Sequence, residues 1–353
     1  MGSGSSRIAI TFDRGETFYF ANEIVSGKVQ LNIIGDDRIK VDEVYLTLTG
    51  EIGYTTTKTL YTSKGGKQTR TEYHDVPFFQ SKIVLAHPEP PQTELIYTEG
   101  QYSWLFSIPL TAYLPPTVGQ PHKYPHVCYY VQVVLNKPWY KPNTRQTFYI
   151  TVFPRVNLLH ITNIFLSTIY GNQNRKDVTL KGALNKLGFV PGETISSTLE
   201  IHNPKHILIK HINISLVDTL QIASNRRRHY VFRTTLPRII NTHDETICET
   251  FSVIIPSMYL APSYKYTGGL RSTAHVCISY ALRFEVKVEG IFTNFDITIP
   301  ITIGTEPAPP QLEFTPQNLL TVTYTSPNDD TNIYEDDNED SPPSYESVMA
   351  KRV

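Results

Sequence analysis

The sequence predicts an all-β protein made of two tandem immunoglobulin-like β-sandwiches and a disordered C-terminal tail. Three observations predict this fold. Short runs alternate apolar and polar residues at period two, a set of motifs occurs twice in the same order, and the composition changes after Thr305. The 353 residues are 40% hydrophobic and 11% aromatic, so the chain has enough apolar material for two sizeable cores.

The first sandwich is expected over residues 7–155. Its alternating runs each place one apolar face inward, and turn signals such as Gly35-Asp36-Asp37 and Pro115-Pro116 separate them. The runs are Val25, Val29, Leu31 and Ile33; Val44, Leu46 and Leu48; and Val131, Val133 and Leu135.

The second sandwich is expected over residues 175–305, because motifs of the first recur there in the same order. Glu23-x-Val25-Ser26-x-x-Val29-x-Leu31 returns as Glu193-x-Ile195-Ser196-x-x-Leu199-x-Ile201, with Asn22 where the second copy has Gly192. Tyr113-Leu114-x-Pro116 and His126-Val127-Cys128 return as Tyr259-Leu260-x-Pro262 and His275-Val276-Cys277. The offset falls from 170 to about 147, which predicts a long extra hairpin between Gly50 and Pro91.

Residues 306–353 form the predicted tail. They include seven prolines and no glycine, with ten acidic residues against two basic ones. Such a segment cannot bury enough apolar surface to offset its ordering entropy, so we expect it to be disordered. The remaining body is mildly basic, at a net charge of +7, and its charges are too evenly spread to indicate a nucleic-acid partner.

The tail contains one Pro-Pro-x-Tyr motif, formed by Pro342, Pro343 and Tyr345. A polyproline II helix has three residues per turn, so Pro342 and Tyr345 fall on one face. WW domains bind such a face through an aromatic groove and a tyrosine pocket. The alternative is a chance occurrence in a proline-rich tail, and the acidic, accessible flanks favour a WW-domain ligand.

Two further motifs are weaker candidates. Met1-Gly2-Ser3-Gly4-Ser5-Ser6 fits the pattern for myristoylation at Gly2, although a flexible leader or a cloning scar is the preferred interpretation. Arg226, Arg227 and Arg228 are expected at a hairpin tip. They are candidate contacts for phosphate or anionic lipid, and a solvated loop is the equal alternative.

Catalytic and metal chemistry are not indicated. The three cysteines, Cys128, Cys248 and Cys277, form no CxxC pair and favour a reducing compartment. His126 and Cys128 share one strand face, as do His275 and Cys277, but we expect core residues there and no metal site. No nucleotide-binding, zinc-protease or hydrolase signature occurs, so neither an enzyme nor a cofactor is expected.

Taken together, these residues resemble the arrestin family, and specifically the α-arrestins, or arrestin-domain-containing proteins. The stretches that carry the resemblance are 19–27, 188–195 and 201–203, with the Pro-Pro-x-Tyr motif in the tail. The resemblance implies arrestin-like sandwiches and a cytoplasmic trafficking adaptor, peripheral at the plasma membrane and endosomes. Its expected partners are a membrane receptor or transporter cargo, a WW-domain HECT-type ubiquitin ligase, and the anionic membrane surface.

A second reading is an arrestin-fold sorting subunit held permanently in an endosomal coat complex. That reading has no need of the Pro-Pro-x-Tyr motif. Binding of WW domains by the tail therefore discriminates between the two functions.

Overall fold

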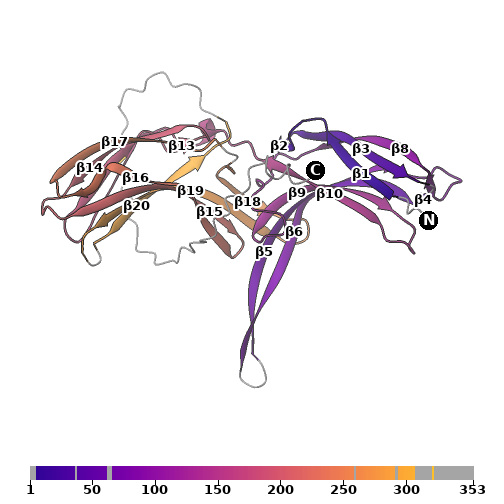
Figure 1. Ribbon diagram of the computed structural model, residues 1–353, viewed down its shortest axis with the longest axis horizontal. Helices are drawn as coiled ribbons and strands as arrows, with labels where there is room; N and C mark the ends of the chain where they lie inside the picture. The colour runs from indigo at the N-terminus through magenta and orange to yellow at the C-terminus, as the bar shows by residue number, and fades with distance from the viewer. Residues whose placement is uncertain are drawn as a thin grey trace.

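The computed structural model describes residues 5–35, 38–61, 66–257, 260–290, 293–306 and 320–321. Two β-sandwiches lie side by side along the long axis of the molecule, and a long hairpin projects from the middle (Figure 1). Within the described ranges the only helical element is the 3-10 turn η1 (Leu158–His160), between the two sandwiches. The predicted all-β class is confirmed.

The first sandwich packs a three-stranded sheet on a five-stranded one. The three-stranded antiparallel sheet has the order β1 (Ser5–Phe12), β3 (Ile24–Ile34), β8 (Gly100–Pro109). The five-stranded sheet has the order β2 (Phe18–Phe20), β10 (Thr144–Phe153), β9 (His126–Asn136), β5 (Glu43–Tyr61), β6 (Lys67–Ala86). A short pair, β4 (Ile39–Val41) and β7 (Leu95–Tyr97), lies at the end away from the second sandwich (Figure 1).

The second sandwich repeats this plan with two larger sheets. One has the order β17 (Thr246–Ile254), β14 (Thr194–His202), β12 (Thr179–Leu184), β11 (Thr168–Gln173), β21 (Leu320–Thr321). The other has the order β13 (Gly188–Phe189), β20 (Phe295–Ile303), β19 (Ala274–Val288), β15 (Ile209–Ile222), β16 (Asn225–Thr242), with β18 (Tyr264–Gly268) paired to β19.

The alternating residues identified from the sequence do line the cores. Every member of the three runs in the first sandwich is at most 2% exposed. In the second sandwich Ile195, Leu199 and Ile201 are at most 1% exposed. Period-two alternation was therefore sufficient to identify both inner faces, because one face of each antiparallel sheet meets the core.

Two segments differ from expectation. The second sandwich was expected from residue 175, but β11 precedes that position and pairs antiparallel with β12. The sequence did not predict β11 because this strand has only one large inward apolar residue, Tyr170. The Gly171-Asn172 pair that follows is also typical of a turn. In the predicted tail, β21 pairs in parallel with β11. Residues 307–319 and 322–353 lie outside the described residues.

The extra hairpin predicted between Gly50 and Pro91 is confirmed. β5 and β6 stay paired from Val44–Ala86 to Tyr61–Lys67, and their outer half extends well beyond the sandwich (Figure 1). Along the hairpin, side chains of β5 contact side chains of β6. The Tyr54 ring stacks on His74 at 4.8 Å between centroids, and Lys58 Nζ pairs with Glu72 Oε2 at 2.8 Å.

Each sandwich contains a hydrogen bond from a buried tyrosine hydroxyl to the carbonyl of a loop residue. Tyr129 is fully buried, and its hydroxyl donates to the carbonyl of Pro115 at 2.6 Å. Tyr280 is 3% exposed and donates in the same way to the carbonyl of Ala261 at 2.6 Å. Each tyrosine thus holds a loop residue, Pro115 or Ala261, against the central strand of its sheet.

Candidate functional site

The segment that leads into the second sandwich and the segment that follows β20 meet at one point, beside the end of the first sandwich. Asn157 forms an isolated parallel bridge with Glu306. The Thr305 N–H donates to the carbonyl of Val156 at 3.0 Å, and the Val156 N–H donates to Thr305 Oγ1 at 2.7 Å. Residue 306, from which the tail was predicted to start, is therefore attached to the segment that follows β10.

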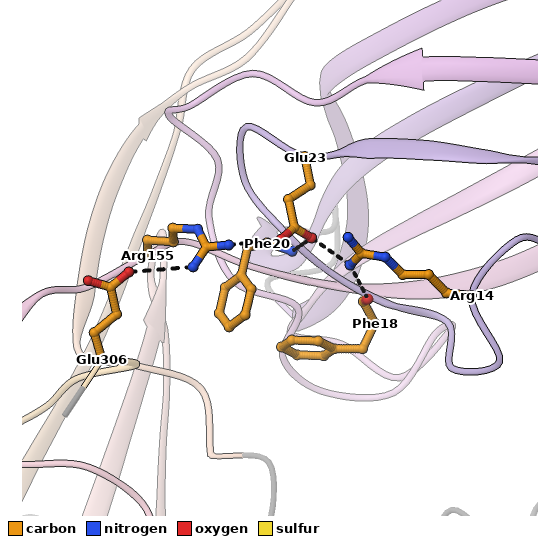
Figure 2. Close-up of polar contacts among 6 residues, drawn as sticks. All are labelled: Arg14, Phe18, Phe20, Glu23, Arg155 and Glu306. Carbon is orange, nitrogen blue, oxygen red and sulfur yellow. Dashed lines mark hydrogen bonds and ion pairs between the residues drawn. The ribbon is translucent and has the colours of Figure 1, made fainter.

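An ion network surrounds this point (Figure 2). Glu23 accepts from Arg155 at 2.8 Å through Oε1 and from Arg14 at 2.7 Å through Oε2. Arg155 also reaches Glu306 Oε1 at 3.4 Å, and its guanidinium lies 4.4 Å from the centroid of the Phe20 ring. Arg155 thus joins a carboxylate of the first sandwich to the residue at which the tail begins.

The electrostatics of Glu23 follow from these contacts. Burial disfavours its charged form, but the hydrogen bond from the Phe20 N–H, at 2.9 Å, and the charges of Arg14 and Arg155 outweigh that effect. The pKa of Glu23 is accordingly lowered from its ordinary value of 4.5. Glu23 is therefore ionised at neutral pH.

The predicted tail and N-terminal sites lie outside the described residues. This applies to Pro342, Pro343 and Tyr345 of the Pro-Pro-x-Tyr motif and to Gly2. They stay predictions. The structure bears on the tail motif through two attachments of the preceding chain, at Glu306 and at β21.

Arg226, Arg227 and Arg228 do follow a hairpin turn, at the start of β16. The residue before them, Asn225, contacts the first sandwich: it accepts from the Thr55 N–H at 2.7 Å and donates to Thr55 Oγ1 at 3.1 Å. This turn is therefore docked on β5 through Asn225. Arg226 and Arg227 remain exposed beside the projecting hairpin.

An aromatic cluster joins the two sandwiches at the base of that hairpin. The Tyr113 ring of the first sandwich stacks on Tyr266 of β18 at 5.0 Å, and Phe78 of β6 meets the same ring at 5.5 Å. The Leu270 N–H donates to the carbonyl of Pro77 at 2.8 Å. The hairpin is thus rooted in the junction between the two sandwiches.

Sequence reasoning missed an exposed aromatic loop between β9 and β10. Trp139 is 95% exposed and Tyr140 is 56% exposed, between Lys137 and Lys141. Asn143 Oδ1 accepts from the Lys137 N–H at 2.8 Å, which fixes the loop. The sequence Lys-Pro-Trp-Tyr-Lys carried the signal, since aromatic rings flanked by lysines are typical of the membrane interface.

The two His-x-Cys pairs differ in their surroundings. His126 and Cys128 are 3% and 5% exposed, whereas His275 is exposed and Cys277 is half-buried. Burial raises the pKa of the Cys128 thiol to about 12, and the carboxylates of Glu51 and Asp75 add to the effect. The first pair lies on the outer face of its sheet, under the 119–125 loop, and is not part of the central core.

In the described part of the chain no helix has the length and hydrophobicity needed to cross a bilayer. Tandem β-sandwiches joined by a short connector, with residue 306 bridged to that connector, define a two-domain β-scaffold. Comparison with known proteins identifies the family. Residues 8–159 match the arrestin (or S-antigen) N-terminal domain, and residues 174–308 match the arrestin (or S-antigen) C-terminal domain.

The chain belongs to the arrestin family. It is also similar to arrestin domain-containing protein 17 of Caenorhabditis elegans, at 24% identity over 212 residues. That match covers 56% of this chain and 48% of the relative, so the chain spans about half the length of the curated relative it matches. Membership of this family supports a trafficking-adaptor role in general.

Proposed function

We propose that this protein is a cytoplasmic adaptor that links a membrane receptor or transporter to a WW-domain ubiquitin ligase of the HECT type. The two sandwiches would hold the cargo, and Pro342, Pro343 and Tyr345 would hold the ligase. Ubiquitination of the cargo, followed by endocytosis, is the proposed outcome. The adaptor supplies proximity, because tethering raises the effective concentration of ligase at the cargo.

After Glu306 the chain is held to the body again where β21 pairs with β11, and the 21-residue step from Thr321 to Pro342 spans at most about 75 Å. A ligase bound to the motif would therefore stay within that distance of the body. Lysines on a cargo held by the sandwiches fall inside the same range.

The exposed surfaces favour peripheral contact with an anionic membrane. The body has a net charge of +7, and Trp139 and Tyr140 are displayed between two lysines. Each basic residue close to such a surface contributes about 1 kcal/mol, screened by salt. Arg226 and Arg227 add exposed positive charge elsewhere on the body.

The test is titration of WW domains from a HECT-type ligase into the full chain. We expect micromolar or weaker binding, about −8 kcal/mol or smaller in magnitude. Tyr345→Ala should abolish binding because the ring is the main anchor. Tyr334→Ala is the matched control, since it removes another tail tyrosine in an equally acidic context.

Two results would overturn the proposal. Equal binding by the wild type and Tyr345→Ala would show that the motif is not the binding site for the ligase. If the wild type binds no WW domain and is isolated in a stoichiometric complex that Tyr345→Ala leaves intact, the permanent coat subunit becomes the better function.

A further inference from the structure

A pocket of about 290 Å³ opens on the outer face of the five-stranded sheet of the first sandwich. Its floor is formed by β5, β6, β9 and β10, and the loop that precedes β9 covers one side. The lining is rich in groups that can ligate a metal ion: Glu51, Asp75, His122, His126 and Cys128. This face lies opposite the core and does not overlap the junction that holds the tail.

Strand register brings three of these groups together. Glu51 of β5 is directly opposite Cys128 of β9, and His126 lies two residues before Cys128 on the same face. One carboxylate oxygen, one imidazole nitrogen and the thiol sulfur all lie within 4.8 Å of one another. A tetrahedral ion with bonds of about 2.0–2.3 Å spaces its ligand atoms by roughly 3.5 Å. Closure on an ion thus requires movements of about 1 Å.

The backbone around His126 is shaped for its ring. Gly53 is the cross-strand partner of His126, and a Cβ at Gly53 would lie 2.2 Å from His126 Cε1. The imidazole therefore occupies the space that a side chain on β5 would fill. A larger residue at position 53 would displace the ring from Glu51 and Cys128.

The hydrogen bonding of His126 leaves one nitrogen for a ligand. Its Nδ1 faces the carbonyl of Lys123 at 3.3 Å, and because a carbonyl can only accept, Nδ1 carries the proton. Nε2 therefore keeps its lone pair, and no described residue donates to it. Histidine ligands of metals are commonly oriented by a backbone carbonyl in this way.

Further acceptors surround the three groups. Asp75 lies across Gly53 from His126, and its Oδ1 accepts from the Tyr124 hydroxyl at 2.7 Å. In the described part of the chain neither Glu51 nor Asp75 forms an ion pair with a lysine or arginine. Their side chains accept from neutral hydroxyls, Glu51 from Tyr130 at 3.5 Å and Asp75 from Tyr124, so a cation beside Glu51 would supply the positive charge that these carboxylates lack.

The second sandwich provides an internal comparison. It has the same His-x-Cys sequence in β19, but Gln221 is opposite Cys277 where the first sandwich has Glu51. His275 is exposed, and its Nδ1 contacts Thr267 Oγ1 at 2.9 Å. The repeated pair thus lacks a third charged ligand in the second copy.

We propose that Glu51, His126 and Cys128 form a zinc-binding site, with water in the fourth position. A thiolate, an imidazole and a carboxylate together suit Zn²⁺, whereas Mg²⁺ and Ca²⁺ require oxygen ligands alone. The thiol proton is released to solvent when the Zn–S bond forms. A bound ion would tie β9 and its preceding loop to β5.

The test uses the full chain, stripped with a chelator and then dialysed against Zn²⁺, with bound zinc measured by mass spectrometry. We expect one Zn²⁺ per chain for the wild type and for Cys277→Ser, the matched control. Cys128→Ser and Glu51→Gln should each weaken binding by at least about tenfold, the lower end of the cost of losing an outer-shell partner. With Co²⁺ as a probe, the wild type and Cys277→Ser should show a sulfur-to-cobalt charge-transfer band.

Circular dichroism checks that each variant folds. If Cys128→Ser does not fold, Glu51→Gln still tests the site, because this substitution preserves the side-chain volume. The proposal is wrong if the wild type takes up no zinc, if Glu51→Gln binds as well as the wild type, or if Cys277→Ser abolishes the cobalt band. The proposal is supported if Glu51→Gln and Cys128→Ser lose zinc while the wild type and Cys277→Ser retain it.

Discussion

At the residue scale, two positions show how one backbone requirement can be met by different side chains. Asn22 and Gly192 occupy equivalent places in the repeat, and both have positive φ, at 69° and 89°. Glycine adopts this conformation freely, and asparagine is among the few other residues that tolerate it. The sequence difference between the two copies therefore preserves one turn, which presents Glu23 in one sandwich and Glu193 in the other.

Glu23 gives the pH prediction. Its folded-state pKa is lowered, so its ion pairs stabilise the protein above pH 4.5, and that contribution is lost as the pH falls through the folded-state pKa. We expect Glu23→Gln to lower the free energy of unfolding at pH 7 by on the order of 1 kcal/mol, because the arginines are half exposed and screened.

Urea unfolding from pH 7 down to pH 3 measures this effect. The difference between the wild type and Glu23→Gln should shrink below pH 4.5, whereas the exposed control Glu99→Gln should show a small difference throughout. A difference for Glu23→Gln that stays constant across the range would contradict the assignment.

At the element scale, the sequence predicted what depends on local pattern and missed what depends on register. Period-two runs identified the inner faces, and the repeat offset located the β5–β6 hairpin. Glu51 could not be linked to His126, because 75 positions separate them and only the pairing of β5 with β9 brings them together. The docking of Asn225 on Thr55 is a contact between the two sandwiches, which no alternation within one strand encodes.

The buried tyrosines give a prediction at this scale. Tyr129→Phe and Tyr280→Phe each remove one hydroxyl and leave a loop carbonyl without its donor, at a cost of about 1–2 kcal/mol in unfolding free energy. Similar losses are expected in both sandwiches because in each a buried tyrosine hydroxyl donates to a loop carbonyl at 2.6 Å.

Urea unfolding monitored by tyrosine and tryptophan fluorescence gives the loss, and hydrogen exchange assigns it to one sandwich. Tyr140→Phe, on the exposed loop, is the control and should change stability very little. Phenylalanine variants as stable as the wild type at both buried positions would show that the repeated bond does not hold these loops.

At the scale of the whole molecule, charge and exposed aromatic surface determine how the body meets a membrane. Trp139 presents nearly its whole side chain to solvent, beside Lys141, on a loop fixed by hydrogen bonds. An aromatic side chain buries about 150–250 Å² when fully covered. Covering half of it at about 25 cal/mol per Å² gives roughly 2 kcal/mol.

We therefore expect Trp139→Ser to weaken binding to vesicles containing anionic lipid by about tenfold or more. Leu105→Ser is the matched control, because Leu105 is 80% exposed on β8. Co-sedimentation at low and high salt separates the aromatic contribution from that of charge, and a joint Arg226→Ala, Arg227→Ala and Arg228→Ala variant tests the arginines. Unchanged binding by Trp139→Ser would remove this loop from the membrane-facing surface.

The bridge between Asn157 and Glu306 has a consequence for how such proteins diversify. Because the bridge brings the two ends of the segment 157–306 together, that segment is a cassette: it could be replaced by another of different surface without relocating Glu306. Recombination at this junction would exchange the recognition surface of the second sandwich and leave the chain that follows Glu306 starting from the same place. One ligand in the tail could then serve a series of relatives whose second sandwiches recognise different proteins.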